Sequence, residues 1–426
     1  MKVKIIGAGL AGCEAALQLA KRGIEVDLYE MRPVKMTGAH TTEKLAEFVC
    51  SNSMGSYDLS VASGLLKKEM ELLGSELIKI AFDVKVPAGN ALAIDREEFS
   101  KRVTELIESN PLINLVREEV NEIPEGDVII ASGPLTSDDM AKSIQDFTQE
   151  EHLHFFDAVA PIVEKDSINF DKAFYGSRYD KGEASYINCP MNKEEYEKFY
   201  NILINAERIE LKEFEKNAKF FESCLPVEVL GSRGVDTLRF GPMKPVGLVD
   251  KRTNEISYAV VQLRQDNALK TLYNLVGFQT NLKWSFQKEL IHSIPGLENA
   301  NIVRYGVMHR NTFINSPKIL TNKLNTKKRE NLFFAGQITG VEGYTESMAS
   351  GLIAGINMAK YLKGDAMLEL PSECILGALL NYITDENHKQ LQPVNSNWAL
   401  INNIELPKKI RKDKKAKDEI LANRSL

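Results

Sequence analysis

The first thirty residues combine an apolar run, three closely spaced glycines and a second apolar run that ends in an acid. The apolar residues before Gly7 predict a strand, and the amphipathic run from Cys13 to Arg22 predicts a helix. The second apolar run predicts another strand and ends at Glu30. Strand, glycine turn, helix and strand, closed by an acid at this distance, indicate a βαβ unit that binds a dinucleotide.

Each glycine of the motif G-A-G-L-A-G has its own role. Gly7 permits a tight turn, Gly9 lets the backbone approach a pyrophosphate, and Gly12 lets the helix pack on the strand. The first helical amides would donate to phosphate oxygens, and Glu30 would accept a hydrogen bond from a ribose hydroxyl. The alternative is an ordinary buried turn, but the presence of the strand, the helix and the acid together favours a dinucleotide site. The motif does not distinguish FAD from NAD. The predicted cofactor-binding residues here are Gly7, Ala8, Gly9, Leu10, Ala11, Gly12 and Glu30.

A second glycine turn lies near the C-terminus, where the run from Asn331 to Tyr344 predicts a strand that ends in glycines. A helix of small residues is expected after it, from Ser347 to Leu362. We therefore expect this segment to complete the sheet of the first unit, with Gly336 and Gln337 beside the same cofactor.

The intervening chain has a different character. Residues 141–300 hold aromatic-rich runs separated by Gly and Pro, which predicts a mixed α+β domain inserted into the nucleotide fold. The predicted fold is therefore α/β, a Rossmann-like, glutathione-reductase-like domain with an insertion. Its expected parts are 1–140, 141–300 and 301–426, the last with a basic tail. That tail, at 406–417, is more readily a solvated or frayed end than an arm that contacts RNA.

Expected elements between the two glycine turns follow the hydrophobic pattern. A polar, turn-rich stretch comes first, at 32–63. The pattern then predicts helices at 64–80 and 97–109, a loop with a short strand at 86–96, and strands at 114–120 and 127–131.

Composition restricts the class of protein. The chain has 426 residues, enough for two or three domains, and contains no apolar run long enough to cross a membrane. We expect a soluble cytoplasmic protein. Five cysteines without a C-x-x-C pair argue against a disulfide framework or a zinc site, so no metal is predicted. A net charge of -6 argues against nonspecific coating of nucleic acid, but it permits a local surface that grips one folded RNA.

Two of the cysteines are candidates for chemistry. Cys50, in E-F-V-C-S-N-S, is followed by polar residues of the kind that begin helices, and a helix N-terminus lowers the pKa of a thiol. Cys224 is ambiguous, because its apolar neighbours fit a buried thiol while Pro226 breaks the strand. The remaining cysteines are expected to serve packing, namely Cys13, Cys189 and Cys374.

Long motifs in a fixed order resemble the TrmFO family of folate- and FAD-dependent tRNA uracil-5 methyltransferases. They include G-A-G-L-A-G, F-V-C-S-N-S, V-P-A-G-N-A-L-A-I-D-R, C-L-P-V-E-V, F-G-P-M-K-P-V-G-L, Y-G-V-M-H-R-N-T-F-I-N-S-P and F-A-G-Q-I-T-G-V-E-G-Y, and they cover essentially the whole chain. The resemblance implies FAD on the nucleotide fold, 5,10-methylenetetrahydrofolate as carbon donor and NADH or NADPH as reductant. The implied partner is tRNA, methylated in its T loop, and the protein would be a monomer or weak dimer without membrane attachment.

The implied reaction explains why thiols matter, because uracil C5 becomes nucleophilic only after a thiolate adds at C6. By the family pattern, Cys224 is the nucleophile, and Cys50 is a second thiol that acts as base or guards a flavin adduct. Six cations in shared motifs could contact folate, RNA phosphate or the enolate oxygen, or else form structural ion pairs: Arg178, Lys244, Arg264, Arg304, His309 and Arg310.

Two departures from the family leave the acceptor open. Members often carry Leu-Arg where this chain has Met54 and Gly55, and a second histidine where it has Thr41. We favour tRNA over a uridine of 23S ribosomal RNA. A small-molecule flavin oxidoreductase and a non-catalytic flavin-binding RNA protein are further alternatives, although neither needs both thiols.

Overall fold

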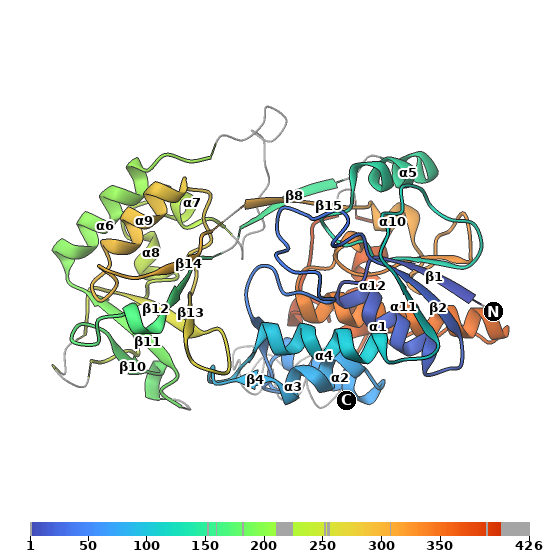
Figure 1. The fold of residues 1–426 in the computed structure, drawn as a ribbon, viewed down its shortest axis with the longest axis horizontal. Coiled ribbons are helices and arrows are strands. Elements are labelled where there is room, and N and C mark those ends of the chain that lie inside the picture. The colour runs from blue at the N-terminus through green and yellow to red at the C-terminus, as the bar shows by residue number, and fades with distance from the viewer. Residues whose placement is uncertain are drawn as a thin grey trace, which may run out of the picture.

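The computed structural model describes residues 2–150, 153–158, 160–180, 183–209, 225–250, 253, 256–306, 308–388 and 391–401, with only the backbone described at 153–158 and 308–310. Figure 1 shows two lobes, which we call the cofactor lobe and the inserted lobe, joined by two strands. Each lobe has its own hydrophobic core.

The cofactor lobe is built on a parallel sheet of five strands in the order β16-β7-β1-β2-β6. Every residue of β7 and β16 is buried, as expected where helices or loops cover both faces of a parallel sheet. The C-terminal strand lies beside β7, so the sheet is completed from the far end of the chain. The Rossmann-like α/β fold is thus confirmed, with strands β1 (Lys2–Ile6), β2 (Glu25–Tyr29), β6 (Ile113–Val116), β7 (Val128–Ile130) and β16 (Leu332–Phe334).

Helices α1 (Leu10–Ala20) and α11 (Tyr344–Lys363) pack against each other at glycines. A Cβ on Gly351 would lie 2.2 Å from the carbonyl oxygen of Ala11, so only glycine permits this approach. The two helices that follow the two glycine turns are thereby fixed relative to each other.

The remaining elements of the cofactor lobe differ from the expectation at three points: β3 lies within the stretch expected to be turn-rich, the strand expected at 114–120 ends at Val116, and one expected helix is divided. The helix expected at 64–80 is two helices, because Gly74 has a φ of +81° and the Ser75 side chain caps the second one. A small antiparallel sheet, in the order β3-β5-β4, is formed by one strand before these two helices and two strands after them. These elements are α2 (Ala62–Leu72), α3 (Glu76–Asp83), α4 (Arg96–Glu108), α5 (Asp138–Thr148), α10 (Ser316–Ile319), α12 (Ile375–Thr384), β3 (Ser53–Ser56), β4 (Lys85–Val86) and β5 (Ala91–Ile94).

The inserted lobe is a six-stranded sheet in the order β10-β11-β12-β13-β9-β14, with antiparallel neighbours. Its strands are β9 (Ile162–Glu164), β10 (Phe174–Gly176), β11 (Tyr186–Met191), β12 (Ala259–Gln265), β13 (Leu272–Leu275) and β14 (Ile302–Arg304). Its helices are α6 (Lys193–Asn205), α7 (Val227–Ser232), α8 (Thr237–Phe240) and α9 (Trp284–His292). Strands and helices together give the expected α+β character.

The lobes are connected by β8 (Leu153–Ala158) and β15 (Met308–Phe313), which pair antiparallel. Met140 and Ile144 of α5 are buried in the core of the cofactor lobe, whereas β14 pairs with β9 of the inserted lobe. We therefore propose domain boundaries after Thr148 and after Arg304 in place of 140 and 300. Within the part of the chain that the structure describes, no helix is both long and apolar enough to span a bilayer.

Candidate functional site

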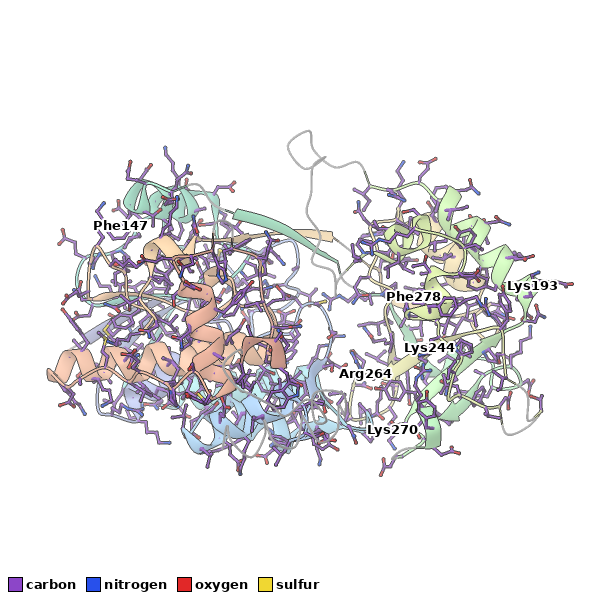
Figure 2. All side chains as sticks on the ribbon, turned by 180° about the vertical axis from the view of Figure 1, so that it is seen from behind. Phe147, Lys193, Lys244, Arg264, Lys270 and Phe278 are labelled. Atoms are coloured by element: carbon purple, nitrogen blue, oxygen red, sulfur yellow. The ribbon has the colours of Figure 1, made fainter. Side chains whose placement is uncertain are left out.

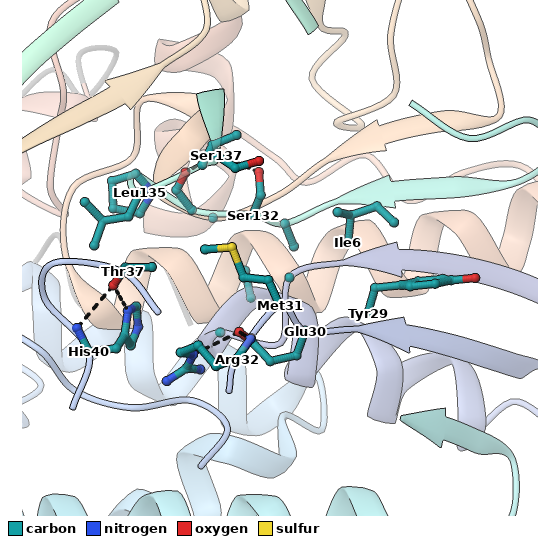
Figure 3. Close-up of a pocket in the computed structure, with 18 of the residues that line it drawn as sticks. Ile6, Tyr29, Glu30, Met31, Arg32, Thr37, His40, Ser132, Leu135 and Ser137 are labelled. Carbon is teal, nitrogen blue, oxygen red and sulfur yellow. Dashed lines mark hydrogen bonds and ion pairs between the residues drawn. The ribbon is translucent and has the colours of Figure 1, made fainter. Parts of the chain in front are cut away.

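A cavity of about 150 Å³, partly open to solvent, lies over the first glycine turn (Figure 3). Its walls come from the glycine turn, the end of β2 and the turn after β16. Among the predicted cofactor-binding residues, the following line it: Gly7, Gly9, Leu10, Ala11, Glu30, Gly336 and Gln337. Ala8 and Gly12 do not line it.

Each of the three positions in the turn favours glycine for a different structural reason. Gly7 has a φ of +101°, and a Cβ on Gly12 would lie 1.8 Å from the carbonyl oxygen of Gly7. At Gly9, by contrast, a Cβ would meet no atom within 4 Å and would extend into open space beside the cavity. The first amides of α1 have no acceptor within the helix and carry its positive dipole end. These features fit the diphosphate of FAD.

Glu30 is held by a buried arginine that the sequence motif did not indicate. Its Oε1 accepts from the backbone N and Nε of Arg32 at 3.1 and 2.9 Å, and its Oε2 accepts from Ala8 N at 3.2 Å. Arg32 also donates to Thr42 O at 3.1 Å and to Glu47 Oε2 at 3.0 Å.

Electrostatics at this pair favour an ionised carboxylate. Burial tends to raise the pKa of Glu30, but the hydrogen bonds and charge of Arg32 outweigh it and lower the pKa. Each carboxylate oxygen has two lone pairs, so Oε2 retains capacity for a ribose hydroxyl. The dashed lines of Figure 3 show Arg32 on the side of Glu30 toward the loop that carries Thr37 and His40.

A second cavity, of about 380 Å³, adjoins the first. The two share five lining residues, namely Val49, Pro134, Leu135, Gln337 and Tyr344. Cys50 lines the second cavity together with Ser51, Asn311, Glu342 and Glu346. A thiol, two acids and an amide therefore face a space next to the one that fits FAD.

The expected helix after Cys50 is wrong. Strand β3 begins at Ser53, and the fully buried Asn52 side chain donates to the carbonyl oxygens of Ile94 at 3.0 Å and Gln265 at 2.9 Å. Asn52 thus links strands of the two lobes instead of capping a helix. The backbone N of Cys50 donates to Tyr344 Oη at 2.7 Å. Any perturbation of this half-buried thiol must come from groups other than a helix dipole.

The departure at Gly55 lies in the wall of the second cavity and has a cation beside it. A Cβ on Gly55 would lie 3.9 Å from Nζ of Lys67, which is 2% exposed and donates to Ser56 O and Ser63 O, both at 2.9 Å. Burial lowers the pKa of Lys67 to about 8, although Glu346 works against this. The sequence motif alone therefore does not reveal the positive charge beside Gly55, because Lys67 supplies it from another segment.

The other cysteines divide into buried and undescribed ones. Cys13 and Cys189 are fully buried, and burial raises the pKa of both thiols. The sulfur of Cys374 accepts from Gly377 N at the start of α12. Cys224 lies in 210–224, outside the described residues, so the structure does not relate it to Cys50.

The six candidate cations do not form one group. Arg264 and Arg304 contact the loop around Cys50, with Arg264 donating to Asn52 and Arg304 to Val49 O. In Figure 2, Arg264 lies on the side of the inserted lobe that faces the cofactor lobe. Arg178 donates to the carbonyl oxygens of Lys244 and Val246, and the side chain of Lys244 is exposed. The side chains of His309 and Arg310 lie outside the described part of the chain.

Comparison with known proteins places the chain in a family. Residues 2–366 match the family model described as Glucose inhibited division protein A, GIDA. A relative from Anoxybacillus flavithermus, named methylenetetrahydrofolate-tRNA-(uracil-5-)-methyltransferase TrmFO, is 58% identical over 426 residues, covering 100% of this chain and 98% of the relative. A TrmFO of the same full name from Brevibacillus brevis is 58% identical over 424 residues, covering 100% and 96%.

The fold also matches a solved structure. GidA of Aquifex aeolicus, in its form II crystal, superimposes with a TM-score of 0.70 at 17% identity, covering 100% of this chain and 72% of that one. At this identity the likeness supports the fold alone. The full-length identity to the curated relatives decides the family: the chain belongs to the TrmFO proteins of the GidA family.

Proposed function

We propose that this protein methylates C5 of a uridine in RNA, with methylenetetrahydrofolate as carbon donor and FAD as cofactor. The observation that carries the proposal is the pair of adjoining cavities, one built on the glycine turn and Glu30, the other lined by Cys50. The name of the relatives states the same donor and a tRNA uracil acceptor. We further propose the T-loop uridine of tRNA as the acceptor.

FAD would be held at the glycine turn, at Glu30 and at Gly336, which lines the same cavity from the second turn. The chemistry that FAD supplies when bound is hydride transfer, which a carbon at the methylene level needs to become a methyl group. The sequence holds no second G-x-G-x-x-G fingerprint. NADH or NADPH would therefore visit transiently as the reductant.

The two cysteines would divide the chemistry on the base. Addition of the Cys224 thiolate to C6 of uracil pushes an electron pair toward the carbonyl and makes C5 nucleophilic. After carbon transfer, a base removes the C5 proton and the C6–sulfur bond breaks, which releases the thiolate. Cys50 is suited to the role of base because it lines the cavity that adjoins the cofactor site.

One experiment tests the proposal. The purified flavoprotein is incubated with methylenetetrahydrofolate, NADH or NADPH, and either undermodified tRNA or ribosomal RNA, and 5-methyluridine is mapped. Cys224→Ala should abolish methylation and leave reduction of the flavin by the nicotinamide coenzyme intact. Retained methylation would assign the nucleophile elsewhere, and protein that neither contains nor takes up FAD would refute the proposal.

Ribosomal RNA is a second candidate acceptor because of one observation at the site. Gly55, where family members often carry arginine, lines the cavity next to Cys50. A changed side chain in that wall can change which RNA is accepted. Product confined to 23S ribosomal RNA in the same experiment would support this candidate over tRNA.

A further inference from the structure

Arginines from both lobes converge on the segment 48–53, which we call the Cys50 loop. Arg96, at the start of α4, donates from Nη1 to the carbonyl oxygen of Phe48 at 3.5 Å. Arg304, at the end of β14 in the inserted lobe, donates from Nη2 to the carbonyl oxygen of Val49 at 2.8 Å. The two residues before Cys50 are thus held by one arginine from each lobe.

The third arginine acts on the residues that follow Cys50. Arg264 of β12 is 9% exposed, and its Nε donates to Oδ1 of Asn52 at 3.1 Å. Because Asn52 also donates to the backbone of Ile94 and Gln265, it ties the loop to one strand of each lobe. The position of the Cys50 loop therefore depends on how the lobes pack together.

The three guanidiniums outnumber the carboxylates that pair with them. Asp266 binds Arg96 through both carboxylate oxygens at 2.6 Å, and among the described residues it is the one carboxylate within ion-pair distance of the three. Burial lowers the pKa of Arg264 and of Arg304, and repulsion from Arg96 adds to both effects. A buried excess of positive charge calls for an anion close by.

We infer that Arg96, Arg264 and Arg304 fix the Cys50 loop and keep the sulfur of Cys50 as a thiolate. A thiolate is the form of Cys50 that can accept a proton, so the inference deepens the proposed function and rests on it for its purpose. The interaction is mutual. Burial lowers the pKa of Arg96, but Asp266, Tyr344 and Cys50 together outweigh burial and raise it.

Other groups around the loop act in both directions. Glu342 and Glu346 line the same cavity as Cys50 and disfavour a second negative charge there. Tyr344 uses its Oη to accept from the backbone of Cys50. For Cys50 to be a thiolate, the positive charge of the three arginines has to outweigh the negative charge of the two acids. Removing one of these charges should therefore shift the midpoint of Cys50 ionisation.

The test follows the pH dependence of Cys50 alkylation by iodoacetamide in the flavin-loaded full-length protein, quantified on the peptide that contains Cys50. Arg304→Gln removes a positive charge, so the midpoint should rise by about one pH unit, with roughly tenfold slower alkylation below it. Asp266→Asn removes the counter-charge, so its midpoint should fall. General loosening of the fold moves both variants in the same direction.

Controls separate charge from structure. Arg304→Lys keeps the charge and should restore the wild-type midpoint. Arg239→Gln removes an equal charge from an arginine of the inserted lobe that binds Asp236 and Tyr258 O, and it should leave the midpoint unchanged. If Arg304→Gln loses its flavin or its far-UV signal, Arg264→Gln takes its place.

A wild-type midpoint near the ordinary thiol value of about 8.5 would overturn the inference. So would equal shifts in Arg304→Gln and Asp266→Asn. Alkylation requires neither RNA nor folate, so the outcome is separate from that of the proposed function. A protein that methylates no RNA but shows the opposed shifts would retain the inference and lose the function.

Discussion

Replacing Gly9 by alanine should weaken FAD binding without weakening the fold. Gly9 has a φ of −75° and a ψ of −167°, which alanine tolerates, and the added Cβ meets no atom within 4 Å. The loss of a favourable helix N-cap and the lower entropy of the unfolded chain nearly cancel, so the free energy of unfolding should change by less than about 1 kcal/mol. The methyl group would occupy space next to the diphosphate, so the Kd for FAD should rise at least about tenfold, or 1.4 kcal/mol.

Gly12→Ala is the matched control, because it should weaken the fold itself, which Gly9→Ala should leave nearly unchanged. The added Cβ would lie 1.8 Å from the carbonyl oxygen of Gly7, where ordinary contact begins at 3.4 Å, so helix α1 must move away from the turn. We expect the apoprotein to lose about 1–3 kcal/mol or more. Thermal unfolding of the flavin-free proteins and quenching of FAD fluorescence on titration measure the two quantities. Unchanged FAD affinity in Gly9→Ala, or a stability loss equal to that of Gly12→Ala, would refute the reasoning.

Two further predictions concern buried charges. Below pH 8 the fold has to bury the charged Lys67, and this cost disappears as pH rises from about 8 toward 10.5, so wild-type unfolding free energy should increase over that range by up to about 3 kcal/mol. Denaturant unfolding at neutral pH and between about pH 8 and 10.5 measures this, and Lys67→Met should show no such increase. If the unfolding free energy of Lys67→Met rose with pH as steeply as that of the wild type, Lys67 would not be its source. Arg32→Met leaves Glu30 and Glu47 buried without their common partner, so it should cost about 3–5 kcal/mol and raise the pKa of Glu30. Thermal unfolding and FAD titration check it, and wild-type stability would show that the pair contributes little.

Much of the cofactor lobe could be predicted because its signals are local. The glycine spacing, the strand before it and the acid at position 30 all lie within one βαβ unit, and each requires a particular residue for a reason of backbone geometry. The helix expected at 64–80 failed at Gly74 for an equally local reason, since a φ of +81° ends a helix and periodicity alone does not register it.

The second part of the site could not be predicted because its contacts join distant segments. Asn52 and Arg264 are 212 residues apart, and Arg96 and Asp266 are 170 apart. Polar residues after Cys50 suggest a helix cap, yet the side chain of Asn52 donates to backbone carbonyls of two strands. Lys67 likewise supplies a cation beside Gly55 that no comparison along the chain could reveal. Partners of buried polar groups are fixed only when the sheets assemble.

The most direct test of the account uses methylenetetrahydrofolate labelled in its one-carbon unit, with the flavin-loaded protein, a nicotinamide coenzyme and undermodified tRNA. We predict that labelled 5-methyluridine forms in the T loop, and that none forms when FAD is removed. A flavin-loaded protein that transfers no label to tRNA or to ribosomal RNA would contradict it.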